Sequence, residues 1–281
     1  MVPIRRSQKA FAIGARRLVS ITGDDAQVRG SPAGSLISNV GAGTAIDLGD
    51  PAHNFTSCVS AGGSVDADCP ASDTSGANVL LTDLGVAIAD FGNLNTLLAG
   101  LGPGTNLGAM AIGGYGMFGD ITAASAGDLE VFSLTSLSAA DGGVLRINGA
   151  SNDVFVILVT GGLSVGNDFG VSLTGGVLPD RVIFSFGGTF VTGDRATLNG
   201  TYVGQSTCML GGDDDKITGA LLCSGDVSSS QRAVINATPF NYATIEGAGL
   251  NAVPEPATYS LFGAGLLALG FARRFTARRA A

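Results

Sequence analysis

Short apolar segments separated by polar turns dominate the chain between residues 107 and 240. The segments are Val154–Val159, Val171–Leu173, Val182–Phe186, Thr189–Thr192, Ala196–Leu198, Ile217–Leu222 and Ala233–Ile235. Their length and their β-branched residues are typical of strands. Dipeptides suited to tight turns lie between them at 152–153, 167–168, 179–180 and 193–194, and their aspartates recur every 12 to 15 residues. The pattern therefore predicts a mainly β body.

Two β architectures fit this pattern. The segments are short, punctuated by glycine and poor in aromatic residues, which favours a parallel β-solenoid in which each coil contacts only its neighbours. Val154–Val159 is apolar at every position, as expected of a strand buried on both faces. Turn signals at this interval also fit an antiparallel β-sandwich, which remains the alternative.

A different periodicity precedes the predicted strands. Between Asn78 and Leu101, large apolar residues recur at steps of three and four, which predicts one flanking α-helix with a single apolar stripe. The stripe consists of Leu81, Leu84, Ile88, Phe91, Leu94, Leu98 and Leu101. Glycines at 85 and 92 each weaken a helix by about 1 kcal/mol relative to alanine. The helix is therefore expected to pack against a larger body.

The C-terminal segment, residues 253–277, combines three features in a fixed order. Pro254, Glu255 and Pro256 precede sixteen uncharged residues from Ala257 to Ala272, and Arg273 and Arg274 follow. A helix of that length would be about 24 Å long, somewhat short of a hydrocarbon core of about 30 Å. It could span with local thinning of the bilayer, leaving the arginines in the cytoplasm and the body outside.

This order resembles the PEP-CTERM sorting signal of Gram-negative bacteria, with Pro254, Glu255, Pro256, Arg273 and Arg274 as the residues of the signal. The resemblance implies an exported protein held in the inner membrane by one hydrophobic C-terminal helix. An exosortase, which is a membrane protease, would then process the signal. Such proteins usually reach the cell surface or the exopolysaccharide matrix.

The charge distribution separates both ends from the body. Within the segment 1–25, the first twenty residues contain five basic residues and no acidic one. The apolar run Ala10–Ala15 is shorter than the apolar stretch of an ordinary export signal. We therefore expect a degenerate or mis-started export signal in this segment. Residues 21–254 carry a formal charge of −16 within a chain total of −8. Such an acidic body repels phosphate backbones, so we expect no nucleic-acid partner.

Within the body, residues 26–250, roughly residues 78–240 resemble known surface domains, in four ordered segments and in a fifth that follows them. The segments are Leu145–Gly149, Asn152–Ile157, Arg181–Phe186, Thr197–Gly204 and Ile217–Leu222. They are similar to the ice-binding-like β-solenoid domain and to the choice-of-anchor A domain. The resemblance implies a right-handed solenoid with a flanking helix and an adhesive or surface role.

Four cysteines, Cys58, Cys69, Cys208 and Cys223, allow three disulfide pairings. Their clustering favours Cys58–Cys69 and Cys208–Cys223, each closing a short loop, provided that the chain is exported. The spacing lacks the close Cys pairs of a zinc site. Sequence alone does not choose among the pairings.

Four motifs suggest chemistry but lack its context. Gly114–Gly119 matches GxGxxG without the helix that a dinucleotide site needs, in a chain with 44 glycines. Gly162–Gly166 matches GxSxG, but the single histidine, His53, precedes the serine instead of following it. Asp213, Asp214 and Asp215 lack calcium-loop spacing, so a solvated loop is expected. Six threonines form no TxT ladder; they are Thr160, Thr174, Thr189, Thr192, Thr197 and Thr201.

We therefore expect no catalytic, cofactor or metal residues. The predicted function is that of an exported, exosortase-sorted surface or exopolysaccharide-matrix protein with a structural or adhesive role, and not an enzyme. An ice-binding or other ligand-binding module on the same fold is the alternative. A secreted hydrolase using paired carboxylates is a third possibility, although no spacing selects two particular acids.

Overall fold

The computed structural model describes the chain in three parts. Residues 101–238 are described except 103, 128, 230 and 231, together with four helical positions between 94 and 100 and the backbone of eight short strands between 11 and 73. The chain divides into two compact units, Met1–Asn241 and Tyr242–Ala281, and every described residue belongs to the first. Residues 253–277, with the predicted C-terminal helix and the sorting residues, lie outside the described part.

The described residues form one large sheet of short strands. The later strands are β9 (Thr105–Ile112), β10 (Phe118–Thr122), β11 (Leu129–Ala139), β12 (Val144–Asn148), β13 (Val154–Val159), β14 (Leu163–Val165), β15 (Gly170–Thr174), β16 (Val182–Phe186), β17 (Phe190–Thr192), β18 (Thr197–Gly204), β19 (Cys208–Leu210), β20 (Lys216–Cys223), β21 (Val227–Ser229) and β22 (Val234–Ala237). The earlier strands are β1 (Phe11–Ala15), β2 (Leu18–Ile21), β3 (Gln27–Gly30), β4 (Asn39–Ala42), β5 (Ala45–Leu48), β6 (Ser57–Ser60), β7 (Ser64–Val65) and β8 (Ser72–Asp73). The 3-10 turn η1 (Pro179–Arg181) precedes β16.

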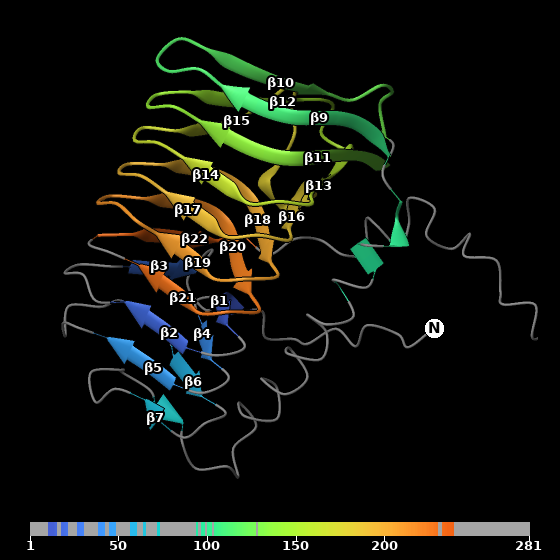
Figure 1. Ribbon diagram of the computed structural model, residues 1–281. Coiled ribbons are helices and arrows are strands. Elements are labelled where there is room, and N and C mark those ends of the chain that lie inside the picture. Colours follow the sequence, from blue (N-terminus) through green and yellow to red (C-terminus); the bar gives the residue numbers. More distant parts are fainter. Residues whose placement is uncertain are drawn as a thin grey trace, which may run out of the picture. The chain divides into compact units, whose positions relative to one another are not determined.

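Consecutive coils pair in parallel and in register, which confirms the solenoid and excludes the antiparallel sandwich for this part of the chain (Figure 1). Three ladders run along the coils. The covered face contains the first half of β11, then β13, β16 and the second halves of β18 and β20. The narrow face contains the second half of β11, then β14, β17, β19 and β21. The polar face contains β10, β12, β15, the first halves of β18 and β20, and β22.

The order of coils in the ladder differs from their order in the sequence. β1, β2 and β3 pair with β20, β21 and β22, so the last coil of the chain stacks on the first (Figure 1). β4 to β8 extend the ladder beyond that junction, and β9 and β10 lie at its other end. β1 and β2 fall within residues 1–25, which we had separated from the body by their charge.

Coil length falls from about 27 residues to about 19 partway along the ladder. On the polar face, Val144 pairs with Gly170 and Gly170 with Thr197, whereas Thr197 pairs with Lys216. The shorter coils lack a loop between the polar and covered faces, because β18 and β20 bend directly from one face to the other at Gly200 and Gly219. Both glycines have positive φ, of 121° and 150°.

The interior is filled by side chains that point inward from all three faces. Phe184 and Tyr202 are register partners, and their rings stack 4.8 Å apart. Cys208 on the narrow face and Cys223 on the covered face form the expected disulfide inside the coils, and both are buried. A Cβ on Gly204 would lie 2.6 Å from the Phe186 ring and 2.8 Å from Cys208 Sγ. A glycine at 204 therefore leaves room for the ring and the disulfide.

The covered face is apolar on its outer side as well. Val156 and Ile183 are register partners on this side, as are Ser185 and Val203, and all four are buried, although their neighbours in sequence fill the interior. Leu94, Leu97, Leu98 and Gly100 are helical, and Leu94 and Leu98 of the predicted stripe are buried. Helical backbone and buried stripe residues are consistent with the expected flanking helix, whose other residues lie outside the described part.

The turn dipeptides lie at two alternating corners of the coil. Asn152–Asp153 and Pro179–Asp180 precede strands of the covered face, whereas Asn167–Asp168 and Gly193–Asp194 precede strands of the polar face. The interval of 12 to 15 residues is therefore half a coil. The predicted strand Ala196–Leu198 was too short, since β18 continues through Gly200 to Gly204.

Replacing Gly219 by alanine should destabilise the solenoid strongly. The added Cβ would overlap the carbonyl oxygen of Gly200, and φ = 150° is unfavourable for an L-residue. We expect the free energy of unfolding to fall by about 3 kcal/mol or more in denaturant titrations. Gly170→Ala is the matched control, because its Cβ would meet nothing closer than 3.7 Å. Equal effects of the two substitutions would contradict this account of the bend.

Candidate binding surfaces of the solenoid

The narrow face presents one outward side chain per coil. In β14, β17, β19 and β21 the first and third residues are buried, and the middle residue points outward. The outward column contains Ser138, Ser164, Val191, Met209 and Ser228, which are register partners in consecutive coils. Parallel strands lie about 4.8 Å apart. The column is therefore a regular, uncharged row of mostly small side chains.

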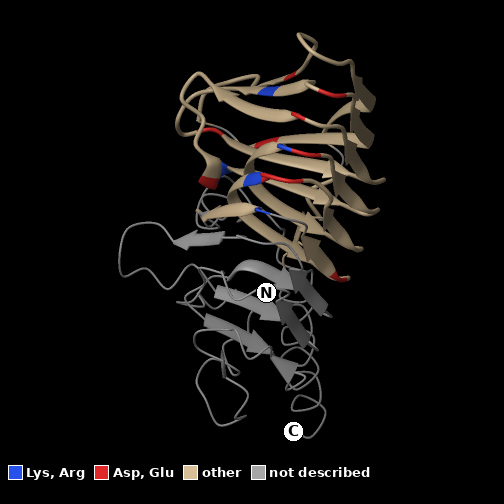
Figure 2. Cartoon of the chain, turned by 90° about the vertical axis from the view of Figure 1, so that its left-hand side faces the viewer, with Lys and Arg blue, Asp and Glu red and all other residues tan. Residues whose placement is uncertain are grey.

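The polar face carries charged, amide and hydroxyl side chains. Asp120, Arg146 and Ser172 follow one another in register on β10, β12 and β15. Arg146 donates from Nε and Nη2 to the two Asp120 carboxylate oxygens, at 2.7 and 3.0 Å. This pair lowers the pKa of Asp120. Figure 2 shows basic and acidic residues side by side on the described coils.

A second ladder of charges follows the corner between the narrow and polar faces. One residue per coil has left-handed backbone geometry here, namely Gly142, Asp168, Arg195, Asp214 and Arg232. Arg195 forms a bidentate pair with Asp168, at 2.6 and 2.9 Å, and Arg232 Nε lies 3.3 Å from Asp214. Hydrogen bonds from Arg195 and Tyr115 lower the pKa of Asp168 to about 2. The Asp168–Arg195 pair therefore stays ionised at neutral pH, and opposite charges of adjacent coils lie side by side along this corner.

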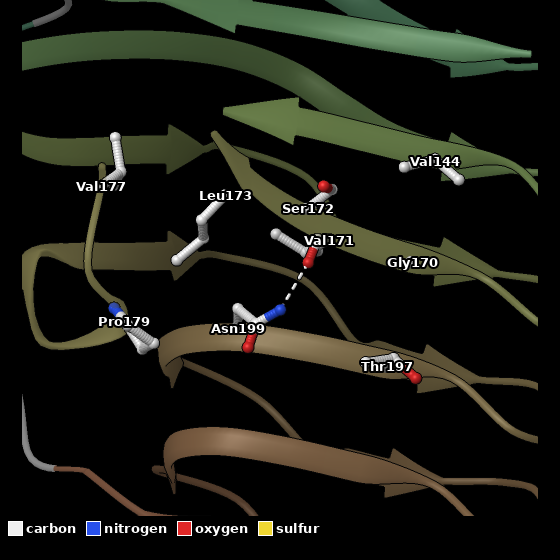
Figure 3. Close-up of a pocket in the computed structure, with 9 residues that line it drawn as sticks. All are labelled: Val144, Gly170, Val171, Ser172, Leu173, Val177, Pro179, Thr197 and Asn199. Carbon is white, nitrogen blue, oxygen red and sulfur yellow. Dashed lines mark hydrogen bonds between the residues drawn. The ribbon is translucent and has the colours of Figure 1, made fainter. Parts of the chain in front are cut away.

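An open hollow of about 610 Å³ interrupts the polar face between β15 and β18 (Figure 3). These strands pair only at Gly170 and Thr197 and then separate. Asn199 bridges part of the gap by donating from Nδ2 to the carbonyl oxygen of Val171, at 2.6 Å. The other lining residues are apolar or carry hydroxyl groups, and none is acidic or basic; they are Val144, Ser172, Leu173, Val177 and Pro179.

The remaining motifs of the sequence lie in turns and strands of the solenoid in the described residues. Gly114–Gly119 is an exposed turn leading into β10, and Ser164 of Gly162–Gly166 is the outward residue of β14. Thr192 and Thr201 are buried, and the hydroxyls of Thr160 and Thr174 donate to backbone carbonyls of the preceding coil. Thr189 and Thr197 are exposed but belong to different parts of the coil. Thr174 ends β15 and Thr197 begins β18, so even the two threonines of the polar face are not register partners.

One predicted disulfide and the single histidine lie wholly or partly outside the described residues. Cys58 is on β6, but Cys69 is not described, so the Cys58–Cys69 pair stays a prediction. His53 is also outside the described part. Within the described residues, no group of three His, Cys, Asp or Glu side chains could hold a metal ion.

The expectation of a solvated loop at Asp213–Asp215 is wrong for Asp215, which is 1% exposed. Its carboxylate accepts hydrogen bonds from Thr192 Oγ1, at 2.7 Å, and from the Ala196 backbone N–H, at 2.8 Å. It lies at the start of a coil in the position of Ala196 and Ala233, and it ties two coils together. Burial raises the pKa of Asp215 to about 6, although these hydrogen bonds and one from Gly212 partly oppose the rise.

Asp215 should make the free energy of unfolding depend on pH. Its pKa is higher in the folded chain than in the unfolded chain, so its favourable contribution is complete below about pH 4 and is lost as pH rises through 6. Asp215→Asn lacks this titration. Denaturant titrations should show wild type losing up to about 3 kcal/mol relative to the variant between pH 4 and 7. Parallel pH profiles would contradict the assignment.

Comparison with known proteins yields one match for the C-terminal motif and separate matches for the solenoid fold. Residues 252–279 match the PEP-CTERM protein-sorting motif. No curated protein matches the chain. In the part of the chain that the structure describes, no helix is both long and apolar enough to cross a membrane.

The fold is similar to solved ice-binding proteins. One from the Antarctic ascomycete Antarctomyces psychrotrophicus is 18% identical, with a TM-score of 0.58 over 83% of this chain and 97% of that one. A glycosylated ice-binding protein from an Arctic yeast is 17% identical, with a TM-score of 0.61 over 83% and 93%. The DUF3494 domain of Shewanella frigidimarina ice-binding protein 1 is 16% identical, with a TM-score of 0.55 over 83% and 96%. The chain thus carries a PEP-CTERM sorting motif and has the β-solenoid fold of ice-binding proteins.

Proposed function

We propose that this chain is an exported protein that an exosortase processes at its C-terminal signal, and that its solenoid then has a structural or adhesive role. That role would be at the cell surface or in the exopolysaccharide matrix. The observation that carries the proposal is the sorting motif at 252–279 attached to a stapled solenoid. Before processing, the uncharged stretch 257–272 would hold the chain in the inner membrane.

The surface chemistry of the solenoid supports a non-enzymatic role. A hydrolase of the paired-carboxylate type needs two acids facing one cleft. The hollow on the polar face is lined by no acid, and the exposed Asp120 and the half-buried Asp168 are each held by an arginine. The buried Asp153 accepts hydrogen bonds from the backbone of Gly127 and Ala150. These carboxylates stabilise turns and coil contacts.

Glu255→Ala should block processing of the sorting signal. In cells with the exosortase, we expect the variant to accumulate at full length in the membrane fraction, while the wild-type chain is shortened and leaves that fraction. Glu246→Ala is the matched control, because it removes a carboxylate upstream of the motif. Immunoblots of cell fractions measure tail length and distribution. Identical results with and without the exosortase would refute the sorting proposal.

Ice binding is the second candidate function, and the narrow face favours it. The column from Ser138 to Ser228 is uncharged and repeats at the coil spacing, so it could contact a lattice at several coils at once. The similar solved structures are of ice-binding proteins, which adds to this support.

Ser164→Lys places a charge in the middle of the narrow face and should abolish ice binding if that face is the contact surface. We expect the concentration needed to inhibit ice recrystallisation to rise roughly ten-fold or more. Thr197→Lys, on the polar face, should retain activity. Thermal hysteresis provides a second measurement. Inactivity of the unmodified chain at high concentration would discard this candidate.

A further inference from the structure

The exposed large apolar side chains are concentrated at one place on the solenoid. Among the described residues there are five; Tyr115 and Met117 lie in the turn between β9 and β10, and Phe118 begins β10. A fourth, Leu178, adjoins Val177 and Pro179 at the edge of the hollow. Val177 and Pro179 lie at the end of the hollow opposite Val144 (Figure 3), and the fifth side chain, Met209, lies on the narrow face. Clustered exposed apolar groups on a soluble surface mark interaction sites.

Phe118 is exposed but held in place. Its ring lies under the guanidinium group of Arg146, with Cζ 4.0 Å from the ring centroid. Arg146 is fixed in turn by both carboxylate oxygens of Asp120. The side chain is 51% exposed, so part of the ring stays open to solvent while Arg146 restrains it.

Tyr115 is held in a parallel way. Its hydroxyl donates to Asp168 Oδ2 at 2.6 Å, and Asp168 is fixed by the bidentate contact with Arg195. The ring lies against Gly142, where a Cβ would overlap it. It is nevertheless 71% exposed. Two aromatic rings are thus immobilised at the surface by two carboxylate–guanidinium pairs, which reduces the entropy cost of binding a ligand.

The two rings lie next to the hollow. Phe118 is the register partner of Val144, and Val144 lines the hollow together with Gly170, Ser172, Thr197 and Asn199. The register pairing therefore places the Phe118 ring beside a recess that carries hydroxyl and amide groups; the recess is shown in Figure 3. We call these residues, from Tyr115 and Phe118 to Asn199, the aromatic strip.

We propose that the aromatic strip binds a neutral polysaccharide chain. A pyranose ring has an apolar face of C–H groups that packs on the negative face of an aromatic ring, and its hydroxyls bond to amide, hydroxyl and paired ionic groups at the edges. Phe118 and Tyr115 offer the stacking surfaces, and Asn199, Ser172 and Thr197 offer the polar contacts.

The charge pattern distinguishes this ligand from an acidic polymer. Arg146 and Arg195 are each neutralised by a bidentate aspartate, so the strip offers no unpaired cation to a polyanion. This inference rests on the proposed function, because a role at the cell surface or in the exopolysaccharide matrix is the reason for choosing a polysaccharide as the ligand.

Affinity electrophoresis of the purified full-length chain tests the strip. Native gels would contain hydroxyethyl cellulose, galactomannan or dextran as neutral probes, and alginate as the acidic probe. We expect retardation by at least one neutral polymer and none by alginate. Tyr115→Ala and Phe118→Ala should each weaken that binding about ten-fold. Tyr115→Phe and Phe118→Tyr, which keep the rings, should retain most of it.

Met209→Ala is the matched control, since it removes an exposed apolar side chain from the narrow face. Denaturant titrations establish that every variant is folded. The proposal is overturned if no neutral polymer retards the chain, if alginate alone does, or if the alanine variants bind like wild type. A second copy of the chain is the alternative occupant of the strip. The proposal is overturned in favour of that alternative if no gel retards the chain and sedimentation shows that Tyr115→Ala and Phe118→Ala abolish self-association.

The outcomes separate this inference from the proposed function. A chain that is processed normally by the exosortase but is not retarded would overturn the polysaccharide site and leave sorting intact. A chain that is retarded but never processed would do the reverse. Because the strip and the narrow face carry different residues, Phe118→Ala should not change ice recrystallisation.

Discussion

The structure depends on parallel, in-register pairing of backbones in successive coils. Each coil must repeat the path of the previous one about 4.8 Å away, so corners stack on corners and leave almost no space between backbones. A Cβ on Gly161 or Gly188 would lie within 2.5 to 2.7 Å of backbone atoms in the adjacent coil. The abundance of glycine thus follows from stacked corners, in addition to flexibility.

The same constraint explains the few polar groups inside the solenoid. At a stacked corner, backbone N–H groups of one coil face the next coil. Those that are buried need a hydrogen-bond acceptor there. Asp215 accepts from Ala196 across coils, and Asp153 accepts from Gly127 in the same way. These carboxylates replace backbone pairing where the path turns. Where pairing fails and no carboxylate substitutes, as between β15 and β18, the surface opens into the hollow and Asn199 bridges it.

On each strand one residue in two points outward, and the three faces differ in the side chains that they present in this way. The covered face is mostly apolar on both sides, with Ser185 and Thr201 buried on its outer side, the narrow face is uncharged, and the polar face carries paired ions next to exposed rings. One small fold therefore offers a regular row and an aromatic strip on separate surfaces. A sorting motif at the end of the chain would bring both surfaces to the exterior of the cell together.

The sequence by itself determined the features that are local. The sorting motif is contiguous, and the apolar segments predict strands one at a time. Clustering of the cysteines favoured the Cys208–Cys223 pair, and the structure then chose it among the three possible pairings. Leu94 and Leu98, which the helical stripe singled out, are buried.

The tertiary structure decided register and facing, since both depend on the length of entire coils. Loss of one loop shortens the coil from about 27 to about 19 residues and makes Gly200 and Gly219 bends within strands instead of strand ends. Stacking places Asp215 inside while Asp213 and Asp214, its neighbours in sequence, remain beside Arg232. It also brings Tyr115 to Asp168, 53 residues later, and so holds in place a ring that the sequence shows only as part of a glycine-rich turn.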